Sequence, residues 1–165
     1  MRIVLLLILL VVARAVPAAE QITRVELAGM PTDVLGQAEL RTGLLCAPGT
    51  VLTPAMLPLD TASITRQLQD VGFLDATVAT TQAGGVITHT ATPGSRYHLR
   101  HIRVAGRDDA AITALLTAVQ VGSGDPCTAV AQARLTAQLP GYQVVRSVDP
   151  VQKTVDLAFQ VAPAP

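Results

Sequence analysis

The sequence predicts an α+β fold in which one strand–helix–helix–strand–strand unit occurs twice. A strand that ends at a glycine occurs at "ITRVELAGM", residues 22–30, and again at "LRHIRVAGR", residues 99–107. After each copy, apolar residues recur at helical spacing, and two alternating segments separated by a polar turn follow. Half of the 165 residues are hydrophobic, which is enough for the small core that a unit of roughly 70–75 residues needs.

In the first unit the strand before Gly29 is followed by two predicted helices. Thr32 or Asp33 can cap the first helix, and Gly72 ends the second after the loop over 47–54. Strands are expected at 74–81 and 86–92, on either side of the polar turn "QAGG". The apolar faces consist of Val34, Leu35, Ala38, Leu44 and Leu45 on the first helix, and of Leu57, Ile64, Leu68 and Val71 on the second.

The second unit repeats this order after Gly106. Asp108 or Asp109 can cap its first helix. Asp125 is expected to cap the second helix, with Pro126 at the first helical position, where its missing N–H costs nothing. Strands are expected at 143–149 and 154–162. The first helix carries Ile112, Leu115, Leu116 and Val119 at spacing i, i+3, i+4, i+7, and the second carries Ala131, Leu135 and Leu139.

Residues 1–19 have the pattern of a secretory signal peptide. Arg2 precedes the apolar run Ile3–Val12, and the small residues Val16 and Ala18 favour cleavage after Ala18 or after the next alanine. The run is shorter than the roughly 20 residues that span a bilayer. An uncleaved membrane anchor is the alternative. Either interpretation places the rest of the chain outside the cytoplasm.

The link "ATPGSRYHLRHIRVAG", residues 91–106, and the helix-to-strand junction "LQDVGFLDATV", residues 68–78, identify a family. With the repeated element order, they resemble the tandem POTRA (polypeptide-transport-associated) domains of outer-membrane protein insertases such as BamA and TamA. Ser95 replaces the proline that is usual in this link, and Pro93 stands where an acidic residue is common. The resemblance implies two domains, 20–94 and 95–165, each a three-stranded mixed sheet covered by two helices.

The resemblance also implies a function. POTRA domains of this family are periplasmic docking platforms for outer-membrane assembly or secretion components and for unfolded outer-membrane substrates, and they can be held at the outer membrane. The chain stops where the family has a β-barrel or a further POTRA domain. We therefore expect a stand-alone periplasmic protein, or the front piece of an insertase whose β-barrel is separately encoded.

Docking in this family includes the addition of a strand to an exposed sheet edge, in which main-chain hydrogen bonds give affinity. The resemblance places these edges at Leu74–Thr81 and Gln143–Asp149, and neither contains a proline or more than one basic residue. The alternative is that both are short strands covered by the neighbouring domain. The predicted partner-binding residues are Leu74, Ala76, Val78, Thr80, Val144, Val145 and Val148.

Cys46 and Cys127 are the only cysteines. An even number of cysteines in an oxidising compartment allows a disulfide, which would lock the two units together. The alternative is two separately buried thiols that act as small apolar residues.

The sequence predicts no catalytic, cofactor or metal site. His98 and His101 are three positions apart, so on a strand they point to opposite faces and do not chelate one ion. Neither a G-x-S-x-G nucleophile motif nor a phosphate-binding loop occurs. A net charge of zero with a single lysine excludes the basic surface that nucleic-acid binding requires. We therefore expect a protein that is not an enzyme.

Two other classes of function remain open at this point. An envelope or cell-division scaffold would keep the N-terminal segment as a membrane anchor. A small-ligand or enzyme domain would need a sizeable apolar pocket with converging polar groups, and the sequence has no sign of one.

Overall fold

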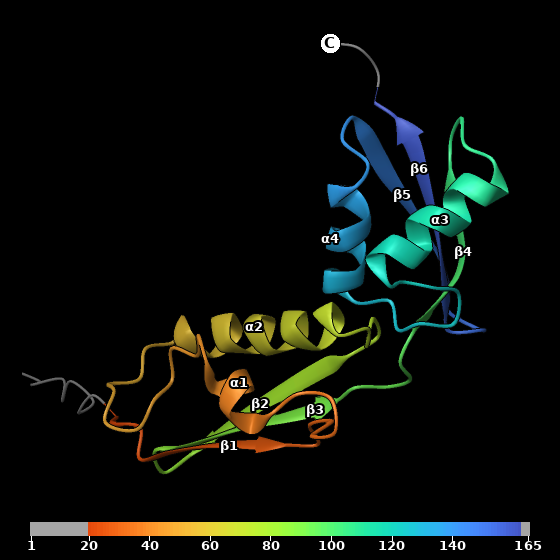
Figure 1. Cartoon of the computed structure of the whole chain (residues 1–165). Coiled ribbons are helices and arrows are strands. Elements are labelled where there is room, and N and C mark those ends of the chain that lie inside the picture. The colour runs from red at the N-terminus through yellow and green to blue at the C-terminus, as the bar shows by residue number, and fades with distance from the viewer. Residues whose placement is uncertain (1–19, 163–165) are drawn as a thin grey trace, which may run out of the picture.

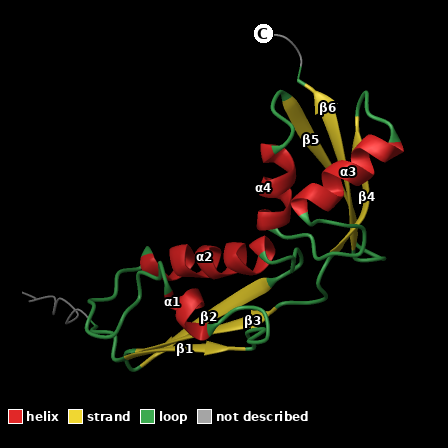
Figure 2. Cartoon of the chain, in the orientation of Figure 1, coloured by secondary structure: helices red, strands yellow, loops and turns green. Residues whose placement is uncertain are grey.

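The computed structural model of the chain describes residues 20–162, in two units that meet at an angle (Figure 1). The expected signal peptide lies outside these residues. The first unit contains β1 (Arg24–Ala28), α1 (Gln37–Arg41), α2 (Met56–Asp70), β2 (Thr77–Ala83) and β3 (Val86–Thr92). β3 lies in the middle of a three-stranded sheet, parallel to β1 and antiparallel to β2. α2 lies along one face of this sheet (Figure 2).

The second unit contains β4 (His98–Val104), α3 (Asp109–Val119), α4 (Ala129–Ala137), β5 (Tyr142–Asp149) and β6 (Thr154–Val161). Its strand order, β4-β6-β5, repeats that of the first sheet, with β6 parallel to β4 and antiparallel to β5. The predicted α+β fold of two mixed three-stranded sheets with helices is confirmed.

The first helix of the first unit is much shorter than predicted. The main-chain N–H groups of Val34 and Leu35 both donate to the Pro31 carbonyl oxygen at 3.0 Å, which makes a turn where Thr32 or Asp33 was expected to cap a helix. Gly36 is the N-cap of α1 instead, and the helix has five residues. The short helix still buries Leu40 in the core.

Of the two caps predicted in the second unit, one is correct. The Asp108 side chain accepts a hydrogen bond from the Ala111 N–H at 2.8 Å, as expected for the cap of α3. The cap of α4 is Thr128, whose hydroxyl accepts from the Ala131 N–H at 3.1 Å. The prediction of Asp125 was wrong because its carboxylate accepts from the Gly122 N–H at 2.7 Å and closes the preceding loop.

Both cysteines are buried free thiols, so the disulfide that was considered is absent from the structure. Cys46 packs with Ile22, Val25 and Ile87 in the first unit, whereas Cys127 belongs to the core of the second. Burial, together with the hydrogen bond and charge of the Asp60 carboxylate, raises the pKa of Cys46 to about 12. Burial also raises the pKa of Cys127. Each thiol therefore acts as a core residue of its own unit.

The two units are joined by a compact set of contacts around Asp75, which follows α2. Its carboxylate Oδ2 accepts hydrogen bonds from the Tyr97 hydroxyl at 2.8 Å and from the Lys153 ammonium at 2.7 Å. Arg96 Nε donates to the Val71 carbonyl oxygen at 2.8 Å. The Leu74 side chain, although it belongs to the first unit, packs against the core of the second. These contacts fix α2 relative to the second sheet.

Gly72 makes this joint possible. Its φ of +102° is a conformation that residues with a Cβ avoid. A Cβ at this position would lie 3.3 Å from Cγ of Arg96, in the link, and 3.4 Å from the carbonyl oxygen of Cys127, in the second unit. The glycine therefore ends α2 and also lets the second unit approach.

Candidate functional site: the free sheet edges

Each sheet has two edge strands, and the chain itself covers part of one edge in each sheet. Along β4, the Leu99 N–H donates to the Asp125 carbonyl oxygen at 2.8 Å, and the Gly124 N–H donates to the Leu99 carbonyl oxygen at 2.7 Å. Along β1, Arg41 Nη1 donates to the Val25 carbonyl oxygen at 3.1 Å. An incoming strand would have to displace these contacts, so β2 and β5 are the better candidates.

The register of β5 shows which of its main-chain groups are free. The Ala162 N–H donates to the Gly141 carbonyl oxygen at 2.9 Å, and the pairing continues with Val145 opposite Ala158. Because antiparallel pairs alternate between hydrogen-bonded and non-hydrogen-bonded, odd-numbered residues of β5 bond to β6. The main-chain groups of Val144, Arg146 and Val148 point away from the sheet. They form no hydrogen bond with another residue in the range 20–162. We call these three residues the β5 edge.

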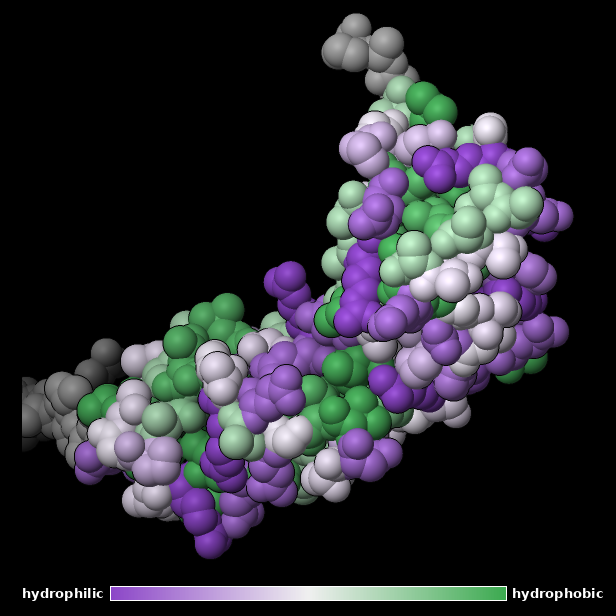
Figure 3. All heavy atoms as spheres, viewed as in Figure 1, coloured by the Kyte–Doolittle hydropathy of each residue, from purple (hydrophilic) through white to green (hydrophobic). Residues whose placement is uncertain are grey.

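The side chains of β5 are exposed on both faces of the sheet. Val144, Arg146 and Val148 are paired with Phe159, Leu157 and Val155, which are buried under the helices, so they lie on the helix face. Val145 is paired with Ala158 and lies on the opposite, open face. Val144, Val145 and Val148 remain 41%, 49% and 40% exposed. Hydrophobic atoms also reach the surface between α3 and α4 (Figure 3). Apolar side chains of β5 therefore extend from the core to the surface, where no other element within residues 20–162 covers them.

β2 is a free edge with less room beside it. Its main-chain groups at Val78, Thr80 and Gln82 point outward by the same alternation. On its helix face, however, the Thr80 hydroxyl lies 2.7 Å from that of Thr61 in α2 and 2.8 Å from His89 Nδ1. Val78 packs against the core of the first unit. An added strand would find no uncovered apolar side chain on this face of β2.

Two predicted edge residues are not in an edge strand. β2 begins at Thr77, so Leu74 and Ala76 precede it. Ala76 is buried in the first core, and Leu74 packs against the second. The prediction was wrong here because the turn after α2 holds the chain against the neighbouring unit for several residues before the strand begins: the Ala76 N–H donates to the Phe73 carbonyl oxygen at 3.1 Å.

A groove of about 340 Å³ lies on the helix face beside β5. One wall is the end of α2, and the other is the start of α4. Figure 1 shows these two helix ends next to each other. Because its walls come from both units, the contacts around Asp75 decide its shape. The residues that line the groove are Gln69, Asp70, Leu74, Ala129, Gln132 and Arg146.

Arg146 lines this groove, although its sequence position was not predicted to be part of a site. Its guanidinium has no carboxylate within 4.0 Å among the described residues, although Asp70 lines the same groove. Asp70 itself is 4.0 Å from Arg66. The sequence signal was present, because Arg146 is the one basic residue of β5 and lies two positions from a valine on either side.

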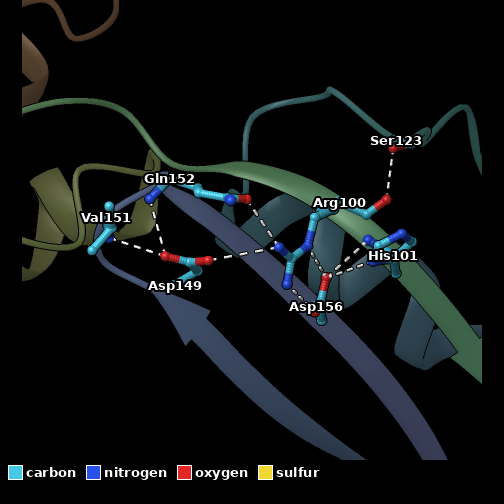
Figure 4. A network of polar contacts seen from close by, with 7 residues as sticks. All are labelled: Arg100, His101, Ser123, Asp149, Val151, Gln152 and Asp156. Carbon is cyan, nitrogen blue, oxygen red and sulfur yellow. Dashed lines mark hydrogen bonds and ion pairs between the residues drawn. The ribbon is translucent and has the colours of Figure 1, made fainter.

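A polar network connects the far end of β5 to β4 and β6 (Figure 4). Arg100 Nη2 lies 2.6 Å from Asp156 Oδ2, and Arg100 Nη1 lies 3.6 Å from Asp149 Oδ2. The hydrogen bond from Arg100 holds the pKa of Asp156 well below its ordinary value. Asp149 Oδ1 accepts from the N–H groups of Val151 and Gln152 at 3.0 Å. Contacts that already hold an edge in place reduce the conformational entropy that is lost when a strand is added to it.

Within residues 20–162, no cluster of three histidine, cysteine or acidic side chains could hold a metal ion. His98 Nδ1 contacts the Gly124 carbonyl oxygen at 2.8 Å, and His101 Nδ1 contacts Asp156 at 3.2 Å, so the two rings have separate partners. No helix in this range is long and apolar enough to cross a membrane.

Comparison with known proteins identifies the fold. No protein-family model matches the sequence, and neither does any curated protein. Solved structures do match. POTRA1-2 of the periplasmic domain of Omp85 from Anabaena aligns with a TM-score of 0.54 at 12% identity, over 88% of this chain and 97% of that one.

Both units have the POTRA fold. BamA from Haemophilus ducreyi lacking POTRA domains 1-3 aligns with a TM-score of 0.55 at 18% identity, over 86% of this chain. The N-terminal domain of Omp85 from Thermosynechococcus elongatus aligns with a TM-score of 0.51 at 22% identity, over 84% of this chain. The chain spans 29% of the BamA chain and 61% of the Omp85 domain. The prediction of tandem POTRA domains is confirmed at the level of the fold.

Proposed function

We propose that this tandem POTRA chain is a periplasmic protein-binding module that serves outer-membrane protein assembly or polypeptide secretion. The POTRA fold supports this proposal, since one matching structure is part of the periplasmic domain of an Omp85 protein and another is a BamA. The partners are assembly or secretion components, or unfolded outer-membrane substrates. The chain acts by binding rather than by catalysis.

The β5 edge is the observation that carries this proposal. Its outward main-chain groups are free, and Val144 and Val148 are exposed on its helix face, as Val145 is on the opposite face of the same strand. The network around Arg100 and Asp156 contacts the far end of the strand. Strand addition uses these groups: main-chain hydrogen bonds supply affinity, and alternate side chains supply specificity. β2 is the second free edge, but α2 already occupies its helix face.

Proline substitutions test the mode of binding. Val144→Pro and Val148→Pro each remove an N–H that points away from β6, so no β5–β6 hydrogen bond is lost. Proline is tolerated at such positions on the free side of an edge strand. Val144→Thr removes the apolar side chain but keeps the N–H. Val78→Pro makes the equivalent change on β2. The probe is a panel of ten-residue peptides with alternating apolar and polar residues, and binding is measured by fluorescence anisotropy.

Strand addition to β5 predicts that Val144→Pro and Val148→Pro abolish peptide binding, that Val144→Thr weakens it and that Val78→Pro leaves it unchanged. Circular dichroism must show that each variant is folded. Peptides that bind the wild type and both β5 proline variants equally well would exclude this edge as the docking site.

The position of the first residue of the exported protein decides between the module and an anchored scaffold. Intact-mass measurement of protein recovered from the envelope should give a chain that starts near Glu20. A chain that keeps residues 1–19 would favour the envelope or cell-division scaffold.

A further inference from the structure

We propose that Arg146 selects the strand that binds to β5, and that the preferred partner presents an acidic residue between two apolar ones on the face that meets α4. This inference rests on the proposed strand addition and names the chemistry of the partner. On the helix face of β5, the side chains of Val144, Arg146 and Val148 form an apolar–basic–apolar series.

In a sheet, directly opposite side chains on one face lie close enough to interact, and opposite charges or two apolar residues are favourable pairs. A strand added to β5 therefore meets Val144 and Val148 with two of its side chains and Arg146 with the side chain between them. The matching pattern is apolar–x–acidic–x–apolar. Because this pattern is the same in both chain directions, it fits a parallel or an antiparallel partner.

The surroundings of Arg146 leave its charge available. Among residues 20–162 no carboxylate lies within 4.0 Å of its guanidinium, and the side chain opens into the groove between α2 and α4. A groove of about 340 Å³ leaves room for the partner's acidic side chain beside Arg146. The other walls contribute the amides of Gln69 and Gln132, which can donate hydrogen bonds to a carboxylate.

The same arginine works against a second copy of this chain as the partner. Pairing two β5 strands so that valines meet valines places Arg146 opposite Arg146, and like charges directly opposite destabilise a pair. A register shifted by two residues avoids this clash but places Arg146 opposite Val144 or Val148. The free edge is thereby protected from self-pairing, which is the usual hazard of an uncovered edge strand.

Three capped peptides that differ at one position test the inference: Thr-Val-Thr-Glu-Thr-Val-Thr, and the same sequence with Gln or Lys in place of Glu. We expect the wild-type chain to bind the Glu peptide roughly two- to fivefold more tightly than the Gln peptide, with the Lys peptide weakest. Arg146→Glu should reverse the order, and Arg146→Gln should remove the preference. The preference of the wild type should also weaken in high salt.

Arg103→Glu is the matched control. It makes the same change of charge on an exposed arginine of β4, whose position opposite Ala158 places it on the open face of the same sheet. This variant should keep the order of the wild type. If all three peptides bind the wild type equally and Val144→Pro still abolishes binding, the selective role of Arg146 is wrong while strand addition stands. If Val144→Pro leaves binding intact, strand addition itself fails.

Self-association provides a second readout that needs no peptide. Sedimentation velocity should show that Arg146→Thr dimerises at concentrations where the wild type and Arg103→Thr stay monomeric. A wild type that already dimerises through β5, with the dimer lost in Val144→Pro, would overturn the inference, because the partner would then be a second copy.

Discussion

At the scale of single residues, the glycines that follow the first strand of each unit have different surroundings. Gly29 and Gly106 both have positive φ, +67° and +76°. A Cβ on Gly29 would lie 2.3 Å from the Ala91 carbonyl oxygen, whereas a Cβ on Gly106 meets nothing within 4 Å. Glycine therefore recurs because the first strand of each unit ends in the same kind of turn. Only in the first unit does a neighbouring strand also exclude a side chain at this position.

These two glycines give a matched pair of substitutions. Gly106→Ala should lower the free energy of unfolding by about 1–2 kcal/mol, the cost of a left-handed conformation for a residue with a Cβ. Gly29→Ala should cost more than this, because strands β1 and β3 must also move apart. Chemical denaturation measures both. Equal losses in the two variants would show that the approach to Ala91 is not limiting.

The cysteines provide a second prediction at this scale. Their raised pKa values keep both thiols protonated at pH 8, and only the thiolate reacts readily. An aromatic disulfide reagent should therefore label neither Cys46 nor Cys127 in the folded protein. It should label two thiols per chain after unfolding without a reductant. Labelling that requires prior reduction would contradict the structure, in which the two residues belong to different cores.

At the scale of elements, the sequence predicted the order of strands and helices because each long element has its own apolar pattern. α3 has its four apolar residues at helical spacing and its cap at Asp108. α1 was predicted too long because Gly36 and the turn at Pro31 outweigh the apolar residues around them. Alternation predicted the strand β5, and the resemblance to POTRA domains implied that it lies at an edge of the sheet. Arg146 was missed because alternation alone does not show which side chain of the strand lines the groove between α2 and α4.

The cap of α4 can be tested by removing it. Thr128→Ala leaves the Ala131 N–H without its side-chain partner, and we expect the free energy of unfolding to fall by about 1 kcal/mol. Thr128→Ser keeps a hydroxyl and should stay close to the wild type. Thermal unfolding followed by circular dichroism compares the two. A loss of similar size in both variants would mean that the hydroxyl does not cap the helix.

At the scale of the whole molecule, the contacts around Asp75 hold the two domains as one platform. The sequence identified the link over residues 91–106, but it did not show that Lys153, 78 positions from Asp75, forms an ion pair with it. Sequence patterns report local periodicity, and this ion pair depends on how the β5–β6 turn meets the end of α2. The groove beside Arg146 depends on the same arrangement.

The joint should weaken in acid. The hydrogen bonds from Lys153, and next from Tyr97, hold the pKa of Asp75 below its ordinary value. A carboxylate with a lowered pKa in the folded state contributes stability that is present above its unfolded pKa, near 3.9, and is lost as the pH falls through the folded value. Asp75→Asn should therefore lose less unfolding free energy between pH 7 and pH 3 than the wild type.

Lys153→Gln removes the largest cause of this shift and should flatten the pH dependence in the same direction. Denaturant titrations at pH 7 and pH 3 measure all three proteins. Identical pH dependence in the wild type and Asp75→Asn would show that the carboxylate does not stabilise the folded chain through these contacts.

Amide hydrogen exchange of β5, followed by NMR, tests the central claim most directly. In the free protein, the N–H groups of Val145 and Ser147 should exchange slowly, and those of Val144, Arg146 and Val148 should exchange fast, because only the first two bond to β6. Adding the Glu peptide at saturation should slow exchange at Val144, Arg146 and Val148. Slowed exchange confined to β2 or to the helices, with these three amides unchanged, would contradict strand addition at β5.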